Sequence, residues 1–190
     1  MNLTNKVGEN CKMNGSVLRS PAILVLTGAS GAGKTTLTHK LNVLAIPGVE
    51  GINCDRVKID KTADSTDRQA EILRYWISQL SQQERRIELA VLDTQIHPHR
   101  ALEVLNQAGI VYAQIVLVDC DPVKRNERLH MDRNQPELAN SRMDCWAAYL
   151  RGQADALNLS IIDTSNDSID KSLNELELLV RDLLRRARAA

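Results

Sequence analysis

Residues 28–35 have the composition and spacing of a loop that binds phosphate. Their sequence is Gly28-Ala29-Ser30-Gly31-Ala32-Gly33-Lys34-Thr35, which fits the pattern GxxxxGK[ST]. The glycines let the backbone turn tightly, so that successive N–H groups point at phosphate oxygens. Lys34 supplies a cation for the β- and γ-phosphates, and the Thr35 hydroxyl is placed to bind Mg²⁺. We therefore predict that this segment, called the phosphate loop below, binds a nucleotide together with the adjacent Thr36.

A carboxylate that could share the metal ion with Thr35 lies farther along the chain. Asp93 ends the apolar run Leu89–Leu92, and Thr94 and Gln95 follow it. An acid at the end of a buried strand beside a phosphate loop holds Mg²⁺, directly or through water. We predict Thr35 and Asp93 as metal ligands and expect Thr94 and Gln95 to orient an acceptor or a water molecule. The alternative for Asp93 is an ordinary turn residue at a strand end.

Short apolar runs and longer amphipathic stretches alternate after Pro21. The apolar runs predict strands at 22–26, 51–54, 89–92, 113–118 and 160–163, and the amphipathic stretches predict helices at 34–44, 66–81, 100–108, 123–130, 142–156 and 169–188. This alternation predicts an α/β fold with a parallel sheet and right-handed crossovers. The phosphate loop joins the first strand to the first helix, whose N-terminal end adds positive partial charge for an anion.

Composition limits the classes of function. The 190 residues carry 24 Lys and Arg against 24 Asp and Glu, which argues against broad binding to nucleic acid or to an anionic membrane surface. No apolar run approaches the roughly 20 residues of a membrane span. Four dispersed cysteines, without a CxxC pair, favour a reducing cytoplasm. Residues 1–20 are polar and aperiodic, so we expect a flexible lead-in followed by one domain over 21–190.

With this loop between a strand and a helix, residues 21–185 resemble the P-loop kinases of small molecules. That group includes adenylate, shikimate and gluconate kinases, chloramphenicol phosphotransferase and zeta-toxin-like kinases. The phosphate loop is the specific part of the match, and the remaining matches are short. The resemblance implies a three-layer P-loop NTPase fold with five parallel strands in the order 2-3-1-4-5. It also implies ATP as phosphoryl donor, an acidic residue after the second strand, and a mobile lid that carries arginines.

The resemblance assigns the acceptor side of the site to residues after the second and third strands. An Asp after the second strand contacts the acceptor hydroxyl in these kinases and takes its proton, and here that residue is Asp55. Asp60 is the alternative, because 57–59 could itself be the strand end. Arg68 would face the acceptor from the second helix. Because these kinases often depart from the usual metal-binding acid, Asp93 is also a candidate for substrate binding.

The lid is expected over residues 131–141, which are polar and irregular. Arg125, Arg128, Arg133 and Arg142 lie in or around it, and we prefer Arg128 and Arg133 as the pair that stabilises the transferring phosphoryl group. Arg128 is also expected to contact the nucleotide. In the kinases that the chain resembles, the loop after the fifth strand touches the adenine ring, which here indicates Thr164 and Asn166.

These expectations describe a phosphotransferase that uses ATP and Mg²⁺ and acts on a hydroxyl or a phosphate of a small metabolite. Lys34, Asp55, Arg128 and Arg133 are its expected catalytic residues. The alternative is a nucleotide-hydrolysing switch or ATPase that acts through a protein partner, although the chain has no clear NKxD motif of a GTPase. His97 and His99 form a weak candidate for a metal site, since no cysteine or carboxylate nearby completes the ligand set. The sequence identifies neither the acceptor nor the oligomeric state.

Overall fold

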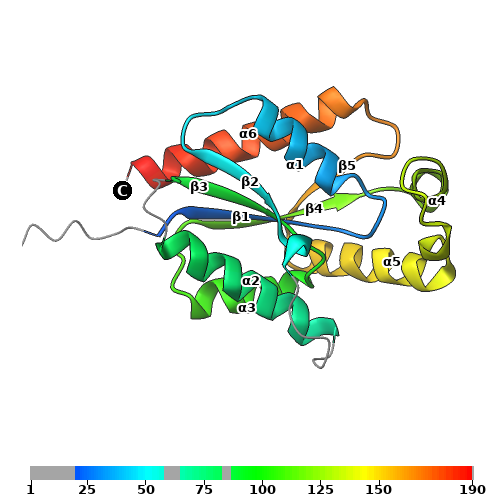
Figure 1. The fold of residues 1–190 in the computed structure, drawn as a ribbon, viewed down its shortest axis with the longest axis horizontal. Coiled ribbons are helices and arrows are strands. Elements are labelled where there is room, and N and C mark those ends of the chain that lie inside the picture. The colour runs from blue at the N-terminus through cyan, green and yellow to red at the C-terminus, as the bar shows by residue number, and fades with distance from the viewer. Residues whose placement is uncertain (1–19, 58–64, 83–86, 190) are drawn as a thin grey trace, which may run out of the picture.

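The computed structural model describes residues 20–57, 65–82 and 87–189 (Figure 1). The strands are β1 (Ala22–Thr27), β2 (Val49–Asn53), β3 (Leu89–Asp93), β4 (Ala113–Asp119) and β5 (Ser160–Asp163). The α-helices are α1 (Lys34–Val43), α2 (Ser65–Gln82), α3 (Pro98–Gln107), α4 (Pro122–Met131), α5 (Ser141–Ala156) and α6 (Ile169–Arg188). Two short 3₁₀ helices, η1 (Cys54–Arg56) and η2 (Pro136–Leu138), follow β2 and α4.

The five strands form one parallel sheet in the order β2-β3-β1-β4-β5. This order confirms the expected one. β1 lies in the centre, where Leu26 is paired with Asp93 of β3 and with Val116 of β4. All six residues of β1 are buried, as a strand covered on both faces requires. The register therefore brings Asp93 directly beside the strand that leads into the phosphate loop.

Alternate residues of β1 enter two separate cores, which makes the fold three-layered. Leu24 and Leu26 pack into a cluster with residues of α1 and α6, whereas Ile23 and Val25 pack with residues of α2 and α3. Figure 1 shows α1 and α6 on one face of the sheet and α2, α3 and α5 on the other. α5 covers β4, with Leu150 and Ala154 packed on Leu117.

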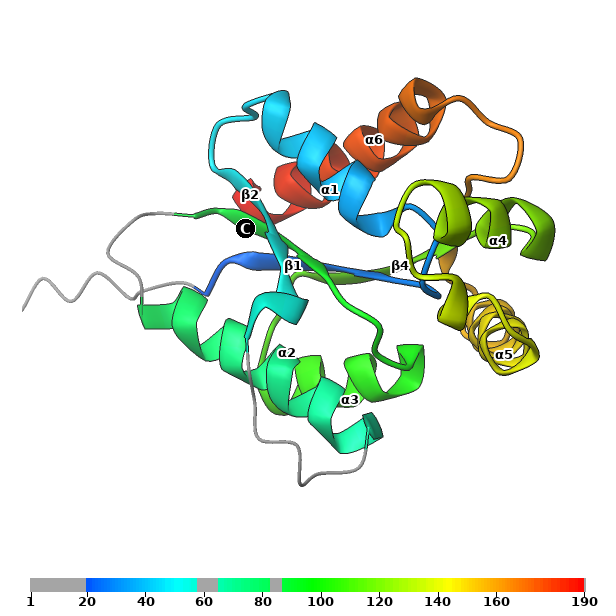
Figure 2. The same ribbon diagram turned by 45° about the vertical axis from the view of Figure 1, so that its right-hand side comes forward.

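The carboxyl ends of the strands lie at one edge of the sheet. α4 stands beyond this edge, and the segment between α4 and α5 passes beside the phosphate loop and the start of α1 (Figure 2). β2 begins and ends earlier than predicted, and residues 54–56 form η1, so Asp55 lies two residues past the strand end. Asp60 and residues 1–19 of the expected lead-in lie outside the described residues. None of the helices described is both long and apolar enough to cross a membrane.

Candidate functional site

The phosphate loop is packed tightly against the elements that follow it in the chain. Gly28 has φ +153°, and a Cβ atom there would lie 2.3 Å from the Val118 carbonyl oxygen of β4. Gly31 has φ +82°, and its Cβ would lie 2.8 Å from Cγ of Arg125 on α4. Only glycine combines these dihedral angles with such close approach. The small residues therefore form a cradle whose backbone follows a tight turn before α1.

Lys34 is held inside this cradle. Its Nζ donates hydrogen bonds to the carbonyl oxygens of Gly28 (2.8 Å) and Ala29 (3.1 Å), and the residue is buried. Burial lowers the pKa of the Lys34 ammonium, while the negative charges of Asp93 and Asp55 act in the opposite direction. When a phosphate enters the loop, the Lys34 ammonium can replace its hydrogen bonds to the loop carbonyls by stronger, charge-assisted ones to phosphate oxygens.

Thr35 and Asp93 meet across the edge of the sheet. The Thr35 hydroxyl donates a hydrogen bond of 2.7 Å to Oδ2 of Asp93, which is 2% exposed. Burial raises the pKa of the Asp93 carboxyl, and the Lys34 charge and the Thr35 hydrogen bond oppose that shift. A hydroxyl and a carboxylate are the oxygen donors that Mg²⁺ prefers when phosphates and water complete its shell. The two residues predicted as metal ligands thus lie together, and their donor atoms fit the ion.

Two arginines reach the phosphate loop from the α4 side. Nη2 of Arg133 lies 3.4 Å from the Thr35 hydroxyl. Arg128 donates to the hydroxyl (2.9 Å) and to the carbonyl oxygen (2.7 Å) of Thr164, and the Thr164 hydroxyl in turn donates to the Ala32 carbonyl (2.8 Å). Arg128 and Thr164 therefore connect α4 and the end of β5 to the phosphate loop. The guanidinium of Arg133 lies near the Thr35 hydroxyl, which is bonded to Asp93.

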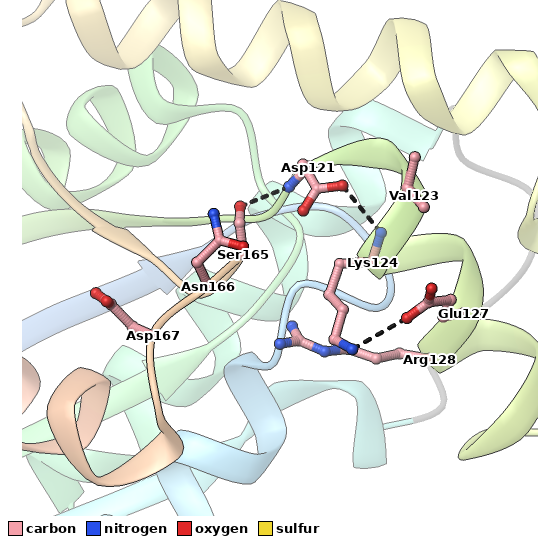
Figure 3. A pocket seen from close by; sticks show the side chains of 8 residues that line it. All are labelled: Asp121, Val123, Lys124, Glu127, Arg128, Ser165, Asn166 and Asp167. Atoms are coloured by element: carbon pink, nitrogen blue, oxygen red, sulfur yellow. Dashed lines mark hydrogen bonds and ion pairs between the residues drawn. The ribbon is translucent and has the colours of Figure 1, made fainter.

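A cavity of about 470 Å³ lies beside Arg128, between α4 and the loop that follows β5. Figure 3 shows its lining: Asp121 and Val123 at the start of α4, Lys124, Glu127 and Arg128 farther along the helix, and Ser165, Asn166 and Asp167 from the loop after β5. The Ser165 hydroxyl accepts from the backbone N–H of Asp121 (2.8 Å), so the two walls are joined. Asn166 and Arg128, both expected to contact the nucleotide, line one hollow, whereas Thr164 is buried.

Arg125 has a different place from the one expected for a lid arginine. Its side chain is 1% exposed, and its guanidinium donates to the carboxylate of Asp144 in the first turn of α5. The stem of Arg125 packs against Gly31, so the residue lies beneath the phosphate loop and joins α4 to α5. A buried charge survives in a fold when it is paired in this way. Arg125 therefore belongs to the framework, and Arg142 is exposed on α5.

The residues expected to bind the acceptor lie at different places along the carboxyl ends of the strands. Asp55 is exposed on η1, where its charge influences the pKa values of both Lys34 and Asp93. Ser30 of the phosphate loop donates to Oε1 of Gln95 (3.5 Å), so Gln95 lies beside the loop. Thr36 is exposed at the start of α1, next to Thr35.

Arg68 is not among the side chains that meet at the loop. Its half-buried side chain makes no hydrogen bond to Lys34, Asp93 or Gln95, and its buried Nε has no hydrogen-bond partner among the described residues. The next residue, Gln69, faces the site instead, because its Oε1 accepts from the Thr94 hydroxyl at 3.0 Å. Sequence reasoning gave Gln69 no role at the site, whereas it named Thr94, with Gln95, as a residue that could orient an acceptor or a water molecule.

The two histidines form part of an aromatic cluster. The rings of His97 and His99 lie 5.7 Å apart, and the ring of His97 also makes edge contacts with Trp146 and Tyr149. Within 20–57, 65–82 and 87–189 no three His, Cys, Asp or Glu side chains form a group that could hold a metal ion. The contacts of His97 and His99 are therefore packing contacts between rings.

The comparisons with known proteins concern the fold. No protein-family model and no curated protein matches the sequence. Among solved structures, shikimate kinase from Acinetobacter baumannii in complex with shikimate is 20% identical, with a TM-score of 0.56 over 87% of this chain and 96% of that one. A gluconokinase from Sinorhizobium meliloti is 15% identical, with a TM-score of 0.58 over 90% and 96%.

APS kinase from Mycobacterium tuberculosis, solved with AMPPNP and APS, is 20% identical, with a TM-score of 0.52 over 87% of this chain and 98% of that one. All three are small-molecule kinases and match nearly along their whole length. The chain thus has the three-layer fold of the P-loop small-molecule kinases, and the resemblance predicted from its sequence is confirmed for the fold.

Proposed function

We propose that this chain is a kinase that transfers the γ-phosphoryl group of ATP to a hydroxyl of a small molecule. The observation that carries the proposal is the meeting of Lys34, Thr35, Asp93 and Arg133 around one glycine cradle at the carboxyl edge of the sheet. Three solved structures with the same fold are small-molecule kinases, which supports this class of reaction. Phosphoryl transfer needs chiefly positioned charges, and these residues supply them.

The chain would bind the nucleotide along two connected surfaces. Lys34 and the loop N–H groups hold the phosphates, and the hollow lined by Arg128 and Asn166 receives the base and ribose. When bound through Thr35 and Asp93, Mg²⁺ neutralises charge on the phosphate oxygens. Arg133 adds a planar cation on the side of the lid segment, residues 131–141, where it stabilises the charge on the transferring group. Closure of this segment over the nucleotide would exclude water.

Asp55 is the proposed general base. It lies near enough to Lys34 and Asp93 to influence both of their pKa values, yet its carboxylate is exposed to an incoming molecule. In the reaction, the acceptor oxygen forms a bond to the γ-phosphorus while the bond between that phosphorus and the β,γ-bridging oxygen breaks. The acceptor proton passes to Asp55, and ADP carries the charge of the leaving oxygen.

Product analysis with a panel of acceptors tests this function. Purified protein, ATP and Mg²⁺ would be incubated with hydroxylated acids, sugars and nucleosides, and phosphorylated products detected by mass spectrometry. ATP hydrolysis would be followed in parallel without acceptor. Product formation with slow hydrolysis supports the kinase. Vigorous hydrolysis without any phosphorylated product contradicts it and favours the nucleotide-hydrolysing switch.

A further inference from the structure

A second cavity, of about 570 Å³, lies between the β3–α3 loop, η2 and the first half of α5. Its walls include Gln69 from α2, Gln95 and His97 from the β3–α3 loop, and Arg142, Trp146 and Tyr149 from α5. Among the described residues, this cavity shares no lining residue with the one in Figure 3. Its volume is within the range of sites that hold small molecules, about 300–1,000 Å³.

Hydrogen bonds connect this second cavity to the phosphate loop. Gln95 lines the cavity and accepts from Ser30 of the loop. Gln69 lines it too and accepts from Thr94, the residue after Asp93. A molecule in this cavity therefore lies beside the phosphates of a nucleotide held by Lys34, which is where a phosphoryl acceptor must be. Its position makes this cavity the acceptor cavity of the proposed kinase.

Aromatic rings form one wall of the acceptor cavity. The rings of Trp146 and Tyr149 are stacked, with centroids 6.0 Å apart and planes inclined by 24°. The ring of His97 is nearly perpendicular to both, and its centroid lies 4.6 Å from that of Trp146 and 5.3 Å from that of Tyr149. The whole chain has only five Trp, Tyr and Phe residues, so the placement of two of them on one cavity is a pronounced concentration. Flat rings bind to such surfaces by stacking and edge contacts.

The aromatic wall is fixed in place by α5 itself. Nε2 of Gln153 lies 2.5 Å from the Tyr149 hydroxyl and 2.8 Å from Nδ1 of His99. These contacts tie the first turn of α3 to α5. Tyr149 nevertheless remains 47% exposed, so part of its ring is free to meet a ligand.

The charges around the acceptor cavity select against cations. Among the described residues that line it, none is Asp or Glu, and Arg142 is the one Arg or Lys. Arg142 has no ion-pair partner in the part of the chain that the structure describes. A planar guanidinium of this kind pairs with a carboxylate through two parallel hydrogen bonds.

We propose that the acceptor is a hydroxylated molecule with a flat aromatic ring and one acidic substituent. Its ring lies against Trp146 and Tyr149, its acidic group pairs with Arg142, and its hydroxyl is directed toward the phosphate loop past Gln95. This inference rests on the proposed kinase function. It separates the acceptor from acyclic polyols, which present no flat ring to the aromatic wall, and from amines, which Arg142 repels.

Matched pairs of probes test the proposal by calorimetry in the presence of ADP and Mg²⁺. One pair is para-hydroxymethylbenzoate and its cyclohexane analogue, and a second replaces the benzene and cyclohexane rings by naphthalene and decalin. Para-aminomethylbenzyl alcohol is the cationic member. We expect the aromatic acids to bind about tenfold more tightly than their saturated partners, because aromatic contacts add to area burial. If neither aromatic acid binds more tightly than its saturated partner, the proposal is overturned.

Two variants locate the binding of the better aromatic acid. Tyr149→Leu should weaken it about three- to tenfold, whereas Tyr75→Leu, which changes a tyrosine of similar exposure on α2, should not. Arg142→Gln should weaken it about tenfold or more, and Arg181→Gln on α6 serves as its control. Unchanged binding in Tyr149→Leu and Arg142→Gln overturns the proposal.

The same experiments separate this proposal from the kinase function. If the aromatic acid binds with the expected variant effects but is not phosphorylated under ATP and Mg²⁺, the assignment of the cavity stands and its use as an acceptor site falls. If the protein phosphorylates a saturated alcohol better than every aromatic acid, the kinase function stands and the aromatic acceptor is overturned.

Discussion

The phosphate loop and the acceptor cavity lie side by side but are built in different ways. The loop consists of consecutive residues, and its shape is fixed by glycines and by the carbonyl groups that hold Lys34. The acceptor cavity takes side chains from α2, the β3–α3 loop, η2 and α5, which are widely separated in the chain. Backbone geometry thus defines the nucleotide side, whereas interchangeable side chains define the acceptor side. A fold of this kind can keep one donor and change its acceptor.

Asp55→Asn is expected to give the largest effect, on the rate of phosphoryl transfer. It tests whether the acceptor side can be damaged while nucleotide binding at the phosphate loop is kept. The amide keeps the shape of the side chain but cannot take a proton, so phosphoryl transfer to an identified acceptor should fall by about 10²–10⁴. ATP affinity, measured by calorimetry with Mg²⁺, should be nearly unchanged, because Asp55 does not belong to the loop.

Two other aspartates provide the contrast to Asp55. Asp93→Asn should raise the Mg²⁺ concentration needed for turnover, since its proposed partner is the metal. Asp60→Asn should do little. If Asp60→Asn abolishes transfer while Asp55→Asn stays active, the general base has been assigned to the wrong residue.

Asp144→Asn tests the ion pair between Arg125 and Asp144. This pair joins α4, which lies beside the phosphate loop, to α5, which forms a wall of the acceptor cavity. The substitution leaves the buried guanidinium of Arg125 without its carboxylate, and we expect the free energy of unfolding to fall by about 3 kcal/mol. Urea unfolding followed by circular dichroism measures this. Asp182→Asn, which changes an exposed carboxylate paired with Arg185 and Arg186, should have a much smaller effect. Equal effects of the two substitutions would show that Arg125 is not a framework residue.

Lys34→Met tests the nucleotide side alone. Methionine keeps the buried aliphatic stem but removes the charge, so ATP affinity should fall about tenfold to a hundredfold. Because burial already disfavours the charged ammonium, the melting temperature should not fall in parallel. Lys40→Met on the same helix removes an outlying charge and should leave ATP affinity unchanged. ATP binding that survives Lys34→Met would contradict the assignment of the phosphate loop.

The smallest effect concerns His97 in the wall of the acceptor cavity. Burial, together with the nearby His99, lowers the pKa of His97 below 6.5. Between that lowered pKa and 6.5 the unfolded chain binds more protons than the folded one, so this contribution to stability is present above pH 6.5 and is lost as pH falls through the folded pKa. Unfolding free energy from about pH 7 to about pH 5 should therefore decline more steeply in the wild type than in His97→Gln. His39→Gln, on the exposed side of α1, is the control, and its curve should follow that of the wild type.

The difference between the two regions also explains what the sequence could predict. The phosphate loop is a contiguous motif between a strand and a helix, and the order of the sheet followed from the resemblance it supports. The position of Asp93 beside Thr35 follows from that order, because β1 and β3 are neighbours in the sheet. These features depend on the backbone and on local sequence.

The acceptor side was predicted less well because it depends on how each helix is rotated. One residue turns a helix by about 100°, and this step separates Arg68, which was predicted, from Gln69, which contacts Thr94. The same limit applies to Arg125, whose burial depends on the close approach of Gly31 and on a partner 19 residues away. Trp146 and Tyr149 share a face of α5 at a spacing of three residues, and this was the one available signal for the wall.

The hydrogen bond from Thr164 to Ala32 has a consequence for the order in which the protein acquires its structure. Its two ends are 132 residues apart in the chain. β1 likewise pairs only with strands that follow much later, β3 and β4. During synthesis the residues of the phosphate loop therefore leave the ribosome long before the segments that shape them, and contacts of such sequence separation form slowly. Nucleotide binding would then be one of the last properties that a newly made chain gains.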